Sequence, residues 1–193
     1  GAEAAIVTGA GRLFSGGADI REFDEPQVDL NLTSVTLRFD CATKPVVAAI
    51  QKTAFGGALE LALSCHFRIC DGSAQFGLPE VKLGIFAGAG GTQRLPRIVG
   101  LEAATRMILS GDPVKGEYAL SCGLVDALFE NDQDFSTHVL DFATRVSHER
   151  DPKRSCGDMT VKHPDPKGFL REFRYQIAPK SKNLVAPERC LES

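Results

Sequence analysis

The stretch PVVAAIQKTAFGGALELALSCHF, residues 45–67, constrains the fold more than any other part of the sequence. Its first six residues form an unbroken apolar run, which is typical of a strand buried on both faces. Two glycines follow a short connection, and from Phe55 to Phe67 the residues predict a helix that is apolar almost all round. A buried strand that leads through a glycine turn into a buried helix is typical of α/β proteins.

Apolar runs and helical patterns alternate in this way over the first two-thirds of the chain. We expect strands over 4–9, 45–50 and 124–129, and two short extended pieces around the Asp71-Gly72 turn. We expect helices over 28–43, 55–67, 101–111, 116–123, 134–149 and 169–178. Residues 12–23 and 78–95 are predicted as loops, the second with a brief helical turn at Pro79. The predicted fold class is α/β, with an exposed linker over 150–168.

Composition narrows the classes of protein to consider. The chain has 193 residues and a formal net charge of -3, which suits one or two domains and does not favour a nucleic-acid binder. Six cysteines without a CxxC pair predict reduced thiols and no disulfide framework. Four histidines without ligand spacing predict no metal site. No apolar run is long enough to span a membrane and no signal peptide is visible, so we expect an intracellular protein with no membrane span.

Glycine-rich stretches could bring backbone N–H groups to a ligand. Gly9-x-Gly11 follows a predicted strand, but Phe14 stands where a dinucleotide-binding loop would have its third glycine, so that interpretation is disfavoured. Gly56-Gly57 lies where a helix begins, and there the N–H groups have no intrahelical partner and the helix dipole is positive. Such a place suits an oxyanion, and an N–H from the SGGAD stretch could be its second donor.

Two glutamates are candidates for acid–base chemistry. Glu60 could simply be an acid favoured in the first turn of a helix. Its apolar neighbours instead favour a desolvated carboxylate with a raised pKa. Glu80 could be a solvated loop acid, although the residues around it are mostly apolar or glycine. A glutamate pair is also found in glycoside hydrolases, but the absence of Trp makes a sugar-stacking cleft unlikely.

Five spaced motifs between Gly9 and Phe129 carry a family resemblance: LFSGGADIREF, KPVVAAI, AFGGALELALSCHFRI, AQFGLPEVKLGIFAGAGGTQRLPRIVG and ALSCGLVDALF. In this order and spacing they resemble the enoyl-CoA hydratase/isomerase (crotonase) superfamily. Within them, AQFGLPEVKLG, together with the closing LVAPERCLES, is most similar to the hydratase part of peroxisomal-type bifunctional enoyl-CoA hydratase/3-hydroxyacyl-CoA dehydrogenases. The resemblance implies a crotonase-like ββα spiral core, without its first β-unit, followed by a helical C-terminal region.

The resemblance also implies roles for single residues. Glu60 and Glu80 would be catalytic, and the N–H groups of Ala18 and Gly57 would form the oxyanion hole. Other positions would contact the substrate: the CoA moiety would lie along the GADIRE loop, and Gly88 would line the acyl pocket. The positions expected to contact substrate are Gly17, Asp19, Ile20, Gly56 and Gly88.

The implied function is hydration of trans-2-enoyl-CoA to 3-hydroxyacyl-CoA in fatty-acid β-oxidation, with Δ3-Δ2-enoyl-CoA isomerase activity possible at the same site. CoA is part of the substrate and no cofactor is expected; NAD would serve only a dehydrogenase domain downstream. Residues 1–149 would form the catalytic core, and 150–193 a linker and helical extension toward that domain. The resemblance is compatible with two forms of assembly, a homotrimer and a longer chain that carries its own dehydrogenase domain. It is also compatible with two locations, the peroxisome and the cytoplasm. The alternative is an inactive crotonase-like fragment that binds CoA or serves assembly.

Overall fold

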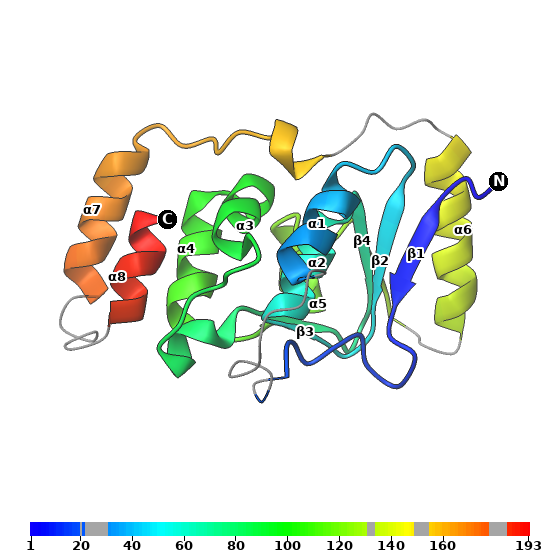
Figure 1. Ribbon diagram of the computed structural model, residues 1–193, viewed down its shortest axis with the longest axis horizontal. Helices are drawn as coiled ribbons and strands as arrows, with labels where there is room; N and C mark the ends of the chain where they lie inside the picture. Colours follow the sequence, from blue (N-terminus) through cyan, green and yellow to red (C-terminus); the bar gives the residue numbers. More distant parts are fainter. Residues whose placement is uncertain (20, 22–30, 131–133, 149–154, 178–184) are drawn as a thin grey trace.

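The computed structural model describes residues 1–19, 21, 31–130, 134–148, 155–177 and 185–193. Its centre is a four-stranded parallel sheet in the order β1-β2-β4-β7 (Figure 1). The strands are β1 (Ala5–Thr8), β2 (Val46–Ile50), β4 (Phe67–Asp71) and β7 (Ala127–Phe129). Every residue of β2 and β4 is buried. This confirms the prediction for β2 that the apolar run is covered on both faces.

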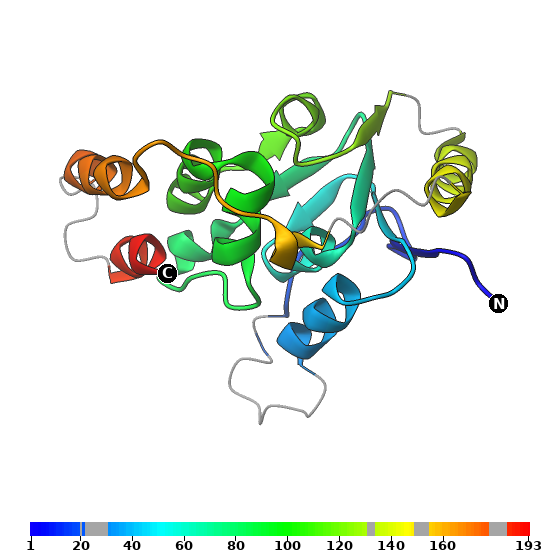
Figure 2. The same cartoon turned by 90° about the horizontal axis from the view of Figure 1, so that it is seen from above.

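The two faces of this sheet support separate cores. On one face, alternate residues of β2 and β4 pack against α6 (Phe135–His148), the helix expected over 134–149. Figure 2 shows α6 on the opposite side of the sheet from the other helices. On the other face, Ala48 and Ile50 belong to the main core, which they form with α2 (Gly57–Ser64) and the helices beyond it. The predicted α/β class is therefore confirmed.

A second, three-stranded sheet in the order β3-β5-β6 positions the glycine turn. β3 (Thr53–Phe55) runs parallel to β5 (Gln75–Gly77), and β6 (Val114–Lys115) is antiparallel to β5. β4 and β5 are the two extended pieces expected around Asp71-Gly72. β3 was not predicted, and the helix expected from Phe55 begins at Gly57 because Phe55 is the last residue of this strand.

Two of the expected helices end at left-handed glycines. α4 (Leu101–Ser110) is followed by Gly111 at φ 63°, and α5 (Gly116–Ser121) leads to Gly123 at φ 78°. Glycine adopts this conformation without steric cost, so it commonly ends helices. Between 28 and 43 the described part contains α1 (Leu32–Asp40).

The prediction of a loop over 78–95 is wrong for residues 91–95, which are helical. The structure has a 3-10 helix, η2 (Pro79–Leu83), and then α3 (Gly91–Val99). α3 begins at a glycine pair and contains Pro96 in its interior. Glycine and proline are the two weakest helix formers, so their presence hid the helical pattern in the sequence. Packing against α2 and α4 compensates for that weakness.

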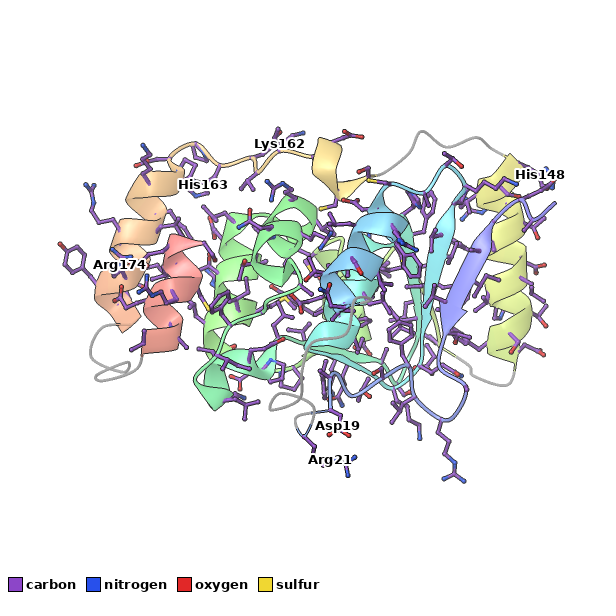
Figure 3. The ribbon with its side chains drawn as sticks, in the orientation of Figure 1. Asp19, Arg21, His148, Lys162, His163 and Arg174 are labelled. Atoms are coloured by element: carbon purple, nitrogen blue, oxygen red, sulfur yellow. The ribbon has the colours of Figure 1, made fainter. Side chains whose placement is uncertain are left out.

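The C-terminal helices lie beyond α4, at the end of the molecule away from α6 (Figure 1). α7 (Pro166–Ile177) begins three residues before the expected helix, because proline suits the first helical turn. α8 (Val185–Glu192) was not predicted. Figure 3 shows Arg174 on α7, and its guanidinium lies 3.1 Å from Glu188 on α8.

The linker expected over 150–168 is corrected in its described part. A short 3-10 helix, η4 (Cys156–Asp158), carries a buried Cys156. The backbone N–H of Cys156 donates to Asp40 at the end of α1, at 2.9 Å. After η4 the chain runs above α3 and α4 to α7, and Figure 3 shows Lys162 and His163 on this connection. The segment is therefore anchored to the core at η4.

Candidate active site

Glu60 lies in the first turn of α2 and is only 3% exposed. Its Oε1 atom accepts hydrogen bonds from the backbone N–H groups of Ala89 and Gly91, both at 2.7 Å. Burial is the main influence and raises the pKa of Glu60, while the N–H groups of Gly91 and Ala89 and the charge of Arg94 lower it. The carboxylate is therefore shielded from water but held by groups that favour its ionised form.

Glu80 lies in η2 and has a different environment. Its Oε2 atom is buried and has no hydrogen-bond partner among the described residues. Burial raises the pKa of Glu80 to about 7; its own backbone N–H opposes the shift, and the charge of Glu60 adds to it. The two acids are thus within electrostatic reach of each other. A buried, unpartnered carboxyl beside a carboxylate is expected to hold a proton.

The backbone at Ala18 and Gly57 converges at the start of α2. Ser15 joins β3 through a bridge to Ala54, which brings the following loop against the helix N-terminus. A Cβ placed on Gly57 would lie 3.9 Å from the Ala18 nitrogen. In the described part of the chain, neither the Ala18 nor the Gly57 N–H donates to a backbone acceptor. The structure thus places the two predicted oxyanion donors side by side.

Gly17 and Gly56 hold positive φ angles that shape this turn. Gly17 has φ 109°, and a Cβ there would lie 2.8 Å from the Phe55 carbonyl oxygen. Gly56 has φ 53°, and a Cβ there would lie 3.1 Å from Glu80 Oε1. A larger residue at either position would strain the backbone and move a neighbouring group.

Asp19 and Gly88 are two further residues expected to contact substrate. Asp19 is partly exposed and binds the guanidinium of Arg21, with Nε at 2.9 Å from Oδ1. Figure 3 shows both side chains at one edge of the molecule, pointing away from it. Gly88 is exposed and immediately precedes Ala89, at the rim of a cleft between α1, α3 and η4. Ile20 lies outside the described residues.

Sequence reasoning missed the groups that bind Glu60. The N–H groups of Ala89 and Gly91 bind its Oε1 atom, and Arg94 donates to the Ala89 carbonyl at 2.9 Å. Backbone donors carry no side-chain signature. The one available signal was the glycine cluster before TQRL, which allows close approach of backbone to another group.

Two other kinds of feature are absent from the described residues. No group of three or more His, Cys, Asp or Glu side chains is arranged to hold a metal ion in that part of the chain. Among the same residues, no helix has the length and apolar character needed to cross a bilayer. The two carboxylates and the neighbouring N–H groups are therefore the candidate site that the geometry defines.

Comparison with known proteins shows the family to which the chain belongs. The family model for enoyl-CoA hydratase/isomerase matches residues 1–154. The chain therefore belongs to the enoyl-CoA hydratase/isomerase family, as its sequence motifs predicted. The match covers both glutamates and both predicted oxyanion donors.

Curated relatives resemble the whole chain. It is 39% identical to the human "Peroxisomal bifunctional enzyme" over 193 residues, covering 99% of this chain and 26% of that protein. It is 40% identical to the Arabidopsis thaliana "Peroxisomal fatty acid beta-oxidation multifunctional protein MFP2" over 204 residues, covering 99% of this chain and 28% of the relative. The chain thus spans about a quarter of the length of these relatives.

Solved structures share the fold. An enoyl-CoA hydratase subunit from Geobacillus kaustophilus aligns with a TM-score of 0.69 at 29% identity, over 92% of this chain and 65% of that one. The enoyl-CoA hydratase from Bacillus anthracis aligns with a TM-score of 0.68 at 27% identity, over 94% of this chain and 72% of that one. The predicted crotonase-like fold is confirmed by these similarities.

Proposed function

We propose that the chain hydrates trans-2-enoyl-CoA thioesters to 3-hydroxyacyl-CoA. The observation that carries this proposal is a pair of carboxylates, the buried Glu60 and the half-buried Glu80, beside two converging N–H groups. Family membership and the hydratase names of several relatives support the same reaction.

In the proposed mechanism, Ala18 and Gly57 bind the thioester oxygen through their N–H groups. Adding water to the conjugated double bond places negative charge on that oxygen as the enolate forms. Preorganised donors stabilise this charge, and losing one such donor typically costs about 3 kcal/mol in the transition state. The positive end of the α2 dipole adds to the stabilisation.

The two glutamates divide the proton transfers. Glu60 acts in its ionised form: with Oε1 held by backbone donors, its other oxygen accepts a hydrogen bond from the attacking water. The water oxygen bonds to the β-carbon, and the proton that it loses passes to Glu60. Protonated Glu80 gives its proton to the α-carbon, and transfer of a proton from Glu60 to Glu80 restores the starting state. Atoms and charges balance without a metal or redox cofactor.

We extend the proposal to the cellular role with the names of the relatives as support. Two of them are peroxisomal proteins, and one of these is a fatty-acid β-oxidation protein, which favours β-oxidation; peroxisome and cytoplasm both remain open as locations. Isomerisation of Δ3-enoyl-CoA needs only one proton shuttle at the same site. We keep residues 1–149 as the core and 150–193 as an extension toward a dehydrogenase domain, the part that would use NAD.

The proposal is tested with a short-chain trans-2-enoyl-CoA and the full 193-residue chain. Mass spectrometry should show a product heavier by one water, formed in proportion to enzyme. The Glu80→Gln variant should form it far more slowly while still binding CoA thioester, measured by calorimetry. Binding without any product from the wild-type chain would instead support a CoA-binding module.

A further inference from the structure

The loop that binds Glu60 is held from its other side by α3. The Ala89 N–H donates to Glu60, and the Ala89 carbonyl accepts from the guanidinium of Arg94 at 2.9 Å. The Gly91 N–H donates to Glu60, and the carbonyl of the same peptide, that of Gly90, accepts from the Arg94 backbone N–H at 2.8 Å. Arg94 therefore holds the Gly90–Gly91 peptide through its backbone N–H, and its guanidinium holds the Ala89–Gly90 peptide that lies between the two donor N–H groups.

Packing leaves the Arg94 side chain little freedom to move. It is 8% exposed, and a Cβ on Gly90 would lie 2.2 Å from its Nη1 atom, so only glycine leaves room for the guanidinium there. Thr36, fully buried in α1, donates a second and longer hydrogen bond of 3.4 Å to the Ala89 carbonyl.

We propose that Arg94 is a positioning residue that orients Glu60 through the Ala89–Gly91 loop and supplies a fixed positive charge behind it. This inference rests on the proposed hydration. Without the guanidinium, the Ala89 carbonyl loses its main partner, and the Ala89–Gly90 peptide between the two N–H donors loses its fixed direction. Misplacement of a catalytic group by about 1 Å can cost about 10²-fold in rate.

The charged groups around Glu60 and Arg94 determine how the pKa of Glu60, and with it the rate, should depend on pH. Glu60 faces Glu80 from η2 and Arg94 from α3. Farther out, Arg94 has near it Asp40 at the end of α1 and Cys156 in η4. Asp40 already accepts the Cys156 N–H at 2.9 Å. The charge of Arg94 lowers the pKa of Glu60, so neutralising Arg94 should raise that pKa and move the acidic limb of the rate profile to higher pH.

The central experiment compares Arg94→Met with Arg97→Met, a control on the same helix whose guanidinium donates to Gln93 and not to the Ala89 loop. Arg94→Met should lower kcat by about 10²-fold with KM little changed, and should shift the acidic limb upward. Arg94→Lys should return the limb to its wild-type position, because the charge is kept. Equal kcat and equal limbs in Arg94→Met and Arg97→Met would overturn the inference.

A second readout separates this inference from the proposed reaction. Carbon-13 NMR of the Glu60 side-chain carboxyl, assigned by its loss in Glu60→Gln, gives the pKa of Glu60 without turnover. That pKa should rise in Arg94→Met and stay constant in Arg97→Met, even if the wild-type chain hydrates nothing. If Arg94→Met does not fold, Gly90→Ala displaces the same guanidinium sterically, and an unchanged Glu60 pKa in that variant would contradict the inference.

Discussion

The two glutamates differ in what each oxygen atom touches. Glu60 is held by two N–H donors, whereas Glu80 has a buried oxygen with no partner among the described residues. Burial raises the pKa of both acids, and at Glu60 the two N–H donors and the charge of Arg94 oppose that rise. We therefore expect the proton of the pair to reside mainly on Glu80 below about pH 7, which is the state that the proposed hydration requires.

This difference predicts a pH dependence of kcat/KM. Activity requires one proton on the pair, and the pKa of Glu80 is raised to about 7. The rate should therefore fall as pH rises through about 7, because Glu80 loses the proton that the α-carbon needs. Initial rates from pH 5 to 9 provide the measurement. A kcat/KM that stays constant between pH 7 and 9 would exclude Glu80 as the acid.

The same raised pKa predicts an effect on stability. The folded-state pKa of Glu80 lies above its ordinary value of 4.5, so its ionisation opposes folding: the cost is absent below that value and complete above about pH 7. At about 1.4 kcal/mol per pKa unit the full effect is about 3 kcal/mol, and solvent screening reduces it to about 1–2 kcal/mol.

Glu80→Gln should therefore raise the free energy of unfolding at pH 8 and leave it nearly unchanged at pH 4, while activity is lost. Urea denaturation at the two pH values measures this. A gain of equal size at both would mean that the charge of Glu80 is not the cause.

At the scale of elements, the site depends on the junction of β3, the 56–57 glycine turn and α2. The turn brings the helix N-terminus against the loop at Ala18, which is itself placed by the bridge from Ser15 to β3. The positive φ of Gly17 gives that loop its direction. The geometry of the two donors is therefore a property of the backbone and not of any side chain.

Gly17→Ala should damage this junction, because its Cβ would lie 2.8 Å from the Phe55 carbonyl oxygen at a φ of 109°. We expect kcat to fall by about 10²-fold as the Ala18 N–H is displaced, with a loss of stability of about 1–3 kcal/mol. Gly16→Ala is the matched control, since a Cβ there meets nothing within 4 Å. Similar kinetics for both variants would refute the role given to the loop.

From the sequence, the side chain of Glu60 could be predicted as part of the candidate site, whereas the backbone groups that bind it could not. Glu60 stood out because a single acid interrupts an apolar helix, a pattern visible in the residues alone. The donors at Ala89 and Gly91 could not be predicted, because α3 begins with a glycine pair and contains Pro96, which together hide the helix. α8 was also missed, because Pro187 falls within a short helix whose burial depends on tertiary contacts.

At the scale of the whole molecule, the main core joins β2, α2 and the helices around α4, with the carboxylates at its edge. The reactivity of two cysteines, Cys65 and Cys70, measures whether reagents can enter this core. Burial raises the pKa of Cys65 and of Cys70 to about 12, so neither forms a reactive thiolate at neutral pH. Cys41, by contrast, is exposed.

A thiol reagent at pH 8 should therefore modify Cys41 first, and should reach Cys65 and Cys70 only when the chain unfolds. Peptide mass spectrometry across a urea gradient identifies the modified residues. The control is the same reaction in fully denaturing urea, where all six cysteines should react. Early modification of Cys65 or Cys70 would show that the core is open in solution.

The central claim is that the two carboxylates act as one unit on a thioester held by Ala18 and Gly57. The most direct test follows the ultraviolet absorbance of a conjugated enoyl-CoA with the wild-type chain, Glu60→Gln, Glu80→Gln and the double variant. We predict that each single variant loses most of the hydration activity. The double variant should be only slightly slower than the slower of the two single variants, because both acids act in the same reaction. Losses that multiply independently, or a single variant with full activity, would contradict the account.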